Sequence, residues 1–236
     1  MGLSSAYGDK DFLKSFRSPP GMFRDFFYLL MTALSRTLFE ATIDGVSNLP
    51  AEGAYIIAAN HCSAADYPLI AWAMPKRARE NLYAVTTSHF YDNPFARMFI
   101  FIATNSVRID TEKDFIPALQ ASARVLAAGK AIYINPEGTW SETGELMPFK
   151  AGVGLLAVEL NVPVVPVFIG GTFEILPPHS LFPKKRGKIT ISFGRPVRPE
   201  KYRELLGKEE NYYVYKRLAD DLRQEIISLR DKKSSL

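Results

Sequence analysis

His61 and Asp66 are the side chains in this chain whose types and spacing most directly indicate chemistry. They follow the apolar run 54–59, which reads as a buried strand, and a helical pattern begins near Asp66. A histidine held by a carboxylate works as a base near neutral pH. The spacing alone is weak, but α/β proteins present reactive side chains where a strand gives way to a helix.

The same spacing sets a geometric condition. Five residues of regular helix turn through about 500°, which would leave His61 and Asp66 on different faces of a helix. The two side chains can therefore meet only if His61 lies in an irregular loop before the helix begins.

A second polar cluster, Glu137, Gly138 and Thr139, follows another predicted strand at 131–135. Glycine lets a backbone approach a ligand closely, and a carboxylate beside it can bind a hydroxyl or hold a cation. An ordinary turn containing proline and glycine has the same composition, so the residues alone leave both interpretations open.

Two cations occupy comparable places. Lys150 precedes the predicted helix 151–160, where free backbone N–H groups and a positive charge could meet an anion. Arg108 lies at the end of the predicted strand 104–109 and is either a further phosphate contact or a surface charge. Features that follow separate strands could converge on one crevice.

Strand-like and helix-like segments alternate through most of the chain, which predicts an α/β fold with a mixed, mostly parallel sheet flanked by helices. The predicted strands are 54–59, 82–86, 104–109, 131–135, 163–169 and 188–193. The predicted helices are 23–41, 66–74, 93–102, 114–128, 151–160 and 211–230. Repeats and linkers are absent from the sequence, so we expect a single domain over 44–236 that includes the C-terminal helix.

The N-terminal part divides into a polar segment, 1–21, and an amphipathic helical segment, 22–43. Charged residues interrupt the second segment, and its apolar stretch is shorter than the roughly 20 residues that span a bilayer. A helix at a membrane interface and a helix packed on the domain both fit this pattern. The aromatic residues of the segment favour the interface.

The amino-acid composition limits the classes of binding partner that we expect. The formal charge of +4 over 236 residues favours anionic partners, either phosphate-bearing substrates or anionic lipid. Nucleic acid is not expected, since no basic run with interleaved aromatic residues appears. The densest basic cluster, 184–188, is either a solvated loop or a contact with lipid or phosphate. The single cysteine, Cys62, excludes an internal disulfide and fits a reducing compartment.

In order and spacing, residues 45–200 resemble the glycerolipid acyltransferase family, which includes 1-acylglycerol-3-phosphate acyltransferases. The segments that carry the resemblance are Asn60-His61 with Asp66, Arg108, Glu137-Gly138-Thr139, Phe149-Lys150 with Gly152, Val162 to Val167, and Phe193-Gly194 with Pro196. Together they are far more specific than any one of them.

The resemblance implies transfer of an acyl group from acyl-CoA or acyl carrier protein to a hydroxyl of a lysolipid, at the cytoplasmic side of a membrane. It assigns His61 as the general base and Asp66 as the group that orients it, without an acyl-enzyme and without a metal or redox cofactor. Backbone N–H groups near Gly138 would stabilise the oxyanion. The residues implied to position the acceptor and its phosphate are Arg108, Glu137, Gly138, Thr139 and Lys150.

One departure from the family pattern bears on the acceptor. Trp140 follows Thr139 where the family commonly has an arginine, so a bidentate phosphate donor is missing. The resemblance implies 1-acylglycerol-3-phosphate as acceptor, and three alternatives stay open: a lipid with an altered headgroup, hydrolysis of the acyl thioester, and a non-catalytic lipid-binding module.

Overall fold

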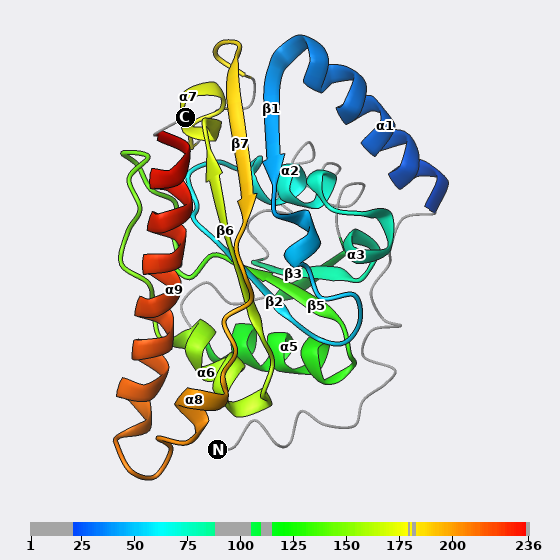
Figure 1. Cartoon of the computed structure of the whole chain (residues 1–236). Helices are drawn as coiled ribbons and strands as arrows, with labels where there is room; N and C mark the ends of the chain where they lie inside the picture. The colour runs from blue at the N-terminus through cyan, green and yellow to red at the C-terminus, as the bar shows by residue number, and fades with distance from the viewer. Residues whose placement is uncertain (1–20, 88–104, 110–114, 179, 181–182, 235–236) are drawn as a thin grey trace.

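The computed structural model describes residues 21–87, 105–109, 115–178, 180 and 183–234, and these form one sheet covered by helices on both faces (Figure 1). The sheet has seven strands in the order β1-β7-β6-β2-β5-β3-β4. Their bounds are β1 Phe39–Asp44, β2 Ile56–Ala59, β3 Leu82–Thr87, β4 Asn105–Ile109, β5 Ala131–Ile134, β6 Val164–Gly170 and β7 Gly187–Phe193. Strands β6, β2, β5, β3 and β4 are parallel, whereas β7 runs antiparallel to β6 and β1 runs parallel to β7. The predicted mixed, mostly parallel α/β fold is confirmed.

The central strands are apolar on both faces. Strand β2 is buried along its whole length, and the first four residues of β6 are buried as well. Continuous apolar runs of this kind are typical of parallel strands that carry helices on both sides. The sheet therefore holds the loops at its carboxyl edge on a rigid base.

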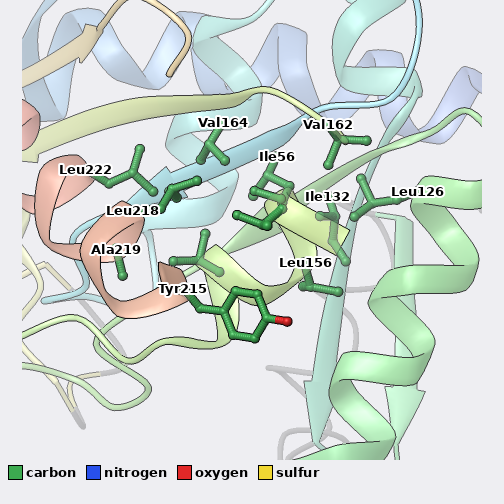
Figure 2. Packing of buried hydrophobic residues seen from close by; sticks show 14 of the residues in the cluster. Ile56, Leu126, Ile132, Leu156, Val162, Val164, Tyr215, Leu218, Ala219 and Leu222 are labelled. Atoms are coloured by element: carbon green, nitrogen blue, oxygen red, sulfur yellow. The ribbon is translucent and has the colours of Figure 1, made fainter. Parts of the chain in front are cut away.

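One face of the sheet is covered by α5 Ile116–Ala127, α6 Gly152–Leu160, α8 Glu200–Arg203 and α9 Asn211–Ser234. Figure 2 shows Leu218 and Leu222 of α9, with Leu156 of α6, packed around Ile56 and Val164 of the sheet. Helices α6 and α9 cross closely at Gly154, where an added Cβ would lie 2.0 Å from the carbonyl oxygen of Tyr215. A side chain at that position would separate the two helices.

The other face is covered by α1 Gly21–Leu38, α2 Asp66–Ala73 and α7 Thr172–Ile175. The short helix α3 Lys76–Glu80 and the 3-10 turn Val46–Asn48 complete the elements within the described residues. None of the described helices is long and apolar enough to cross a bilayer.

The structure corrects the predicted helix 23–41 and the segment 22–43. Helix α1 ends at Leu38, and residues 39–44 form β1 at the edge of the sheet. Pairing with β7 supplies the backbone hydrogen bonds of this short segment, whose alternation was hidden by the helical pattern before it. The predicted helix 93–102, and the polar segment 1–21 apart from Gly21, lie outside the described residues.

Helix α1 packs on the domain with its polar side. Arg24 donates from Nη1 to Asn105 Oδ1 at 3.1 Å, and Lys76 Nζ donates to Asp25 Oδ2 at 2.6 Å. Further along the helix, the Arg79 guanidinium lies 4.1 Å from the centre of the buried Tyr28 ring. The polar contacts of α1 therefore face the protein.

The opposite side of α1 is apolar and faces away from the domain. Five large side chains are 44–74% exposed: Met22, Phe23, Phe26, Leu29 and Leu30. At 100° per residue these positions fall within an arc of about 120°. An apolar stripe this wide normally packs on a core, so its outward orientation is the reverse of the usual surface helix.

Candidate active site

His61 lies in the loop between β2 and α2, as its spacing from Asp66 requires. Helix α2 begins at Asp66, and His61 Nδ1 lies 3.0 Å from Asp66 Oδ2. The His61 side chain is 20% exposed, whereas the Asp66 side chain is fully buried. Asp66 thus occupies Nδ1 from inside the protein and leaves Nε2 as the nitrogen for an external group.

The Asp66 carboxylate is held from both of its oxygens. Oδ2 also accepts the backbone N–H groups of Cys62 at 2.8 Å and Ser63 at 2.9 Å. Oδ1 accepts the Thr172 hydroxyl at 2.8 Å. Four donors on one buried carboxylate match the acceptor capacity of an ionised group and fix its orientation.

Thr172 is a site residue that sequence reasoning missed. It opens the short helix α7 after β6, 106 residues from Asp66 along the chain, and it is 1% exposed. The available signal was its position directly after Gly170 and Gly171, at the end of a predicted strand.

Asn60 explains how the end of β6 reaches the His61 loop. Its amide nitrogen donates to the carbonyl of Ile169 at 2.8 Å, and its amide oxygen accepts the N–H of Ile169 at 2.9 Å. An asparagine offers both a donor and an acceptor, so its side chain satisfies both backbone groups of one residue. The contact fixes the β6 end, and with it Thr172, against the His61 loop.

Glu137 faces into the protein. It is 3% exposed, and its two oxygens accept the backbone N–H groups of His61 at 3.1 Å and Met147 at 3.3 Å. Burial raises the pKa of Glu137 from its ordinary value of 4.5 to about 7, against the opposing effect of the two N–H donors. In this arrangement Glu137 holds the His61 loop, and its implied contact with an acceptor stays a prediction.

Gly138 and Lys150 lie against each other although they are twelve positions apart in the sequence. Gly138 has a φ of 77°, and a Cβ added there would lie 2.6 Å from Lys150 Nζ. The positive φ favours glycine at this position, and the short distance shows how closely the flexible Lys150 side chain lies over the turn. The N–H of Gly138 donates to the carbonyl of Asn135 at 3.1 Å, so this amide is not available as an oxyanion donor. Lys150 and Thr139 are exposed beside this turn.

Arg108 is brought to the same edge of the sheet but not into a described contact. It lies one residue before the end of β4, where its backbone pairs with Thr86 of β3. Strand β4 is two positions from β5, which corresponds to about 10 Å across the sheet. The side chain of Arg108, like His89 and His179, lies outside the described part of the structure.

Trp140 forms an apolar wall beside His61. Its ring centre lies 5.6 Å from that of His61 in an edge-to-face arrangement. The N–H of Ser141 donates to the carbonyl of His61 at 2.8 Å, which ties the residues after Trp140 to the His61 loop. The described site therefore combines one exposed edge of an imidazole, one indole and one exposed ammonium group.

Comparison with known proteins gives consistent results. The family model "Acyltransferase" matches residues 40–170, which is more than half of the chain. A 1-acyl-sn-glycerol-3-phosphate acyltransferase from Cocos nucifera is 29% identical over 176 residues, covering 73% of this chain and 54% of that protein. Its counterpart from Saccharomyces cerevisiae is 27% identical over 184 residues, covering 75% of this chain and 57% of that protein. The chain thus spans just over half the length of these relatives.

Among solved structures, the 1-acyl-sn-glycerophosphate (LPA) acyltransferase PlsC from Thermotoga maritima is similar in fold. The TM-score is 0.63 at 22% identity, and the match covers 94% of this chain and 79% of the other.

Proposed function

The chain belongs to the acyltransferase family, and we propose that it moves a fatty acyl group from acyl-CoA or acyl carrier protein to a hydroxyl of a lysophospholipid, in the first instance 1-acylglycerol-3-phosphate. The observation that carries the proposal is the contact of 3.0 Å between His61 Nδ1 and the buried Asp66 carboxylate. The names of the relatives support the acceptor.

In the proposed reaction, His61 Nε2 takes the proton of the acceptor hydroxyl as its oxygen attacks the thioester carbonyl. A carbon–oxygen bond forms, and collapse of the tetrahedral intermediate breaks the carbon–sulfur bond. The departing thiolate receives the proton from the His61 imidazolium, so the base is restored. Asp66 keeps Nδ1 protonated and stabilises the imidazolium while it exists.

Lys150 is the expected partner of the acceptor phosphate. The ammonium group of Lys150 lies over the turn at Gly138 and is exposed, at the same edge of the sheet as His61. Thr139 offers a hydroxyl beside it, and Arg108 is proposed to add a second cation. A lysine binds phosphate as a point charge and tolerates variation in headgroup geometry better than an arginine pair.

The indole of Trp140 favours a second candidate, an acceptor whose headgroup is not a simple phosphate. It lies edge-to-face with His61 and supplies apolar surface next to the reacting hydroxyl. An acceptor with a neutral or amino-acid headgroup would lose little from the absence of a guanidinium there.

An acceptor panel with purified protein and a labelled acyl thioester tests both candidates. We expect lysophosphatidate to exceed neutral lysolipids by about tenfold in kcat/KM, the worth of one hydrogen bond to a charged group. Lys150→Met should remove this preference and leave the neutral acceptors unchanged. A wild-type preference for another headgroup overturns the first candidate. Thiol release that is equally fast without acceptor overturns transfer in favour of hydrolysis.

We extend the proposal to the place where the reaction occurs, a peripheral position on the cytoplasmic side of a membrane. The outward apolar stripe of α1, residues 22, 23, 26, 29 and 30, is suited to the interface of a bilayer. Its polar side is already used by contacts to the domain such as Asp25 with Lys76, so the helix does not need to turn over.

Charge complementarity supports lipid as the occupant of this surface. Lys184, Lys185 and Arg186 are exposed directly before β7, whose first residue, Gly187, pairs with Phe39, the first residue of β1 after α1. Cations close to the C-terminal end of α1 favour anionic lipid as the surface that this helix meets, at about 1 kcal/mol for each residue near the membrane.

A further inference from the structure

Thr172 is the one described side chain bonded to Asp66 Oδ1, the oxygen that faces away from the imidazole. The other oxygen, Oδ2, takes the His61 ring and the two backbone N–H groups. A carboxylate bonded through one oxygen alone can rotate about its Cβ–Cγ bond and move Oδ2 out of line with Nδ1. A donor on Oδ1 opposes that rotation.

The direction of the hydrogen bonds follows from the chemistry of the groups. An ionised carboxylate only accepts, so the Thr172 hydroxyl donates its proton to Asp66. The hydroxyl oxygen then remains an acceptor, and Cys62 Sγ lies 3.2 Å from it. Burial raises the pKa of the Cys62 thiol to about 12, so the thiol keeps its proton and donates to Thr172. The chain runs from thiol to hydroxyl to carboxylate, and the imidazole meets the carboxylate from the other side.

A sharp turn of the backbone at Gly171 places Thr172 next to Asp66. Gly171 has a φ of 85°, and a Cβ added to it would lie 1.9 Å from the carbonyl oxygen of Lys188. The chain therefore turns sharply at the end of β6 in a conformation that only glycine allows. The contact of Asn60 with Ile169 fixes the same end of β6 to the His61 loop.

We propose that Thr172 is a positioning residue for the acyl-transfer base: it orients Asp66, and through Asp66 the imidazole of His61, with Cys62 as the outer donor. The inference rests on the proposed function, since it concerns the same base. Thr172 is 1% exposed, so it acts without touching substrate.

The test compares Thr172→Val, which removes the hydroxyl at nearly constant volume, with Thr172→Ser, which keeps it. We expect Thr172→Val to lower kcat about tenfold, the worth of one hydrogen bond to a charged group, with KM unchanged. The acid limb of the kcat/KM profile should move to lower pH, because a carboxylate that has turned out of line with Nδ1 stabilises the imidazolium less. Thr172→Ser should restore both quantities, and Cys62→Ala should lower kcat about twofold.

The single cysteine supplies the control for folding. Cys62 is 4% exposed, so a thiol reagent should label it at the same slow rate in Thr172→Val and in the wild type if the site stays folded. A variant that loses stability but keeps the wild-type kcat per folded molecule and the wild-type pH profile shows a structural role alone, and overturns the proposal.

A nitrogen-detected NMR titration of His61 separates this inference from the proposed function, because it needs no turnover. His61→Ala identifies its signals among the three histidines. If the wild type transfers no acyl group but Thr172→Val still lowers the fraction of His61 protonated at Nδ1, the positioning holds and the function fails. If the wild type is active and Thr172→Val changes neither the kinetics nor the His61 signals, the positioning fails and the function stands.

Discussion

The loop around His61 and helix α1 place their polar and apolar groups in opposite ways. In the loop, the fully buried Asp66 carboxylate has four hydrogen-bond donors, all from the same chain. In α1, the polar residues bind the domain, and five large apolar side chains, 44–74% exposed, point away from it. The hydrogen bonds around His61 and Asp66 are thus complete within the protein, whereas the described residues leave the outer side of α1 uncovered. We therefore expect that acyl transfer and membrane binding can each be abolished by substitutions that leave the other intact.

The largest expected effect comes from removing the proposed base, His61. His61→Ala should lower kcat about 10³-fold, within the range that general base catalysis contributes. Binding of the molecule to vesicles should stay at the wild-type level, because His61 lies in the loop after β2 and not on α1. The measurement is acyl transfer to lysophosphatidate together with vesicle sedimentation. Activity within tenfold of the wild type would remove His61 from the role of base.

The converse change alters α1 and spares the base. Replacing Phe23, Phe26 and Leu29 by serine should weaken binding to anionic vesicles about 100-fold, since each half-exposed side chain contributes roughly 1 kcal/mol on insertion. Stability should hardly change, because these side chains are 56–68% exposed in the protein. Turnover of a short-chain, water-soluble acceptor should stay normal, and turnover of acceptor in vesicles should fall.

Tyr212 and Tyr213 offer a matched control for that experiment. They are 54% and 59% exposed on α9, which covers the other face of the sheet, so their replacement by serine should leave vesicle binding intact. High salt should weaken wild-type binding in part, through the cations at 184–186. If the α1 variant instead dissociates a dimer and binds vesicles normally, the occupant of the stripe is a second copy of the chain.

The two regions also differ in how far the sequence predicts them. The spacing of His61 and Asp66, with the strand before them, sets the condition for their contact, because the two side chains can meet only if His61 lies in a loop. The meeting of the Glu137 turn with that loop follows from the common edge of parallel strands. These features depend on short stretches of chain and on one topological rule.

The features that the sequence did not predict depend on contacts between distant segments. Thr172 is 106 residues from Asp66, and a threonine after two glycines has many ordinary explanations. The inward direction of Glu137 depends on the N–H of Met147, which only the folded loop brings near. For α1, the pattern showed two faces but not which one packs, and the ion pairs of Arg24 and Asp25 with other elements decide it.

The smallest expected effect tests whether the hydrogen-bond donors around Glu137 compensate for the burial of its carboxylate. Burial raises its pKa to about 7, so between pH 4.5 and 7 the folded protein holds more protons there than the unfolded chain. Stability from this group is therefore fully present below pH 4.5 and is lost as pH rises through about 7. Glu137→Gln cannot titrate, so the free energy of unfolding of the wild type should fall relative to that of the variant from pH 5 to pH 8, measured by urea denaturation. Other groups titrate equally in both proteins and cancel in the difference.

A difference in unfolding free energy that does not vary with pH would contradict this expectation. It would mean that the N–H groups of His61 and Met147, with the nearby charge of Arg223, stabilise the ionised carboxylate as well as water does. The protein would then satisfy the buried carboxylate of Glu137 with its own donors, as it does that of Asp66.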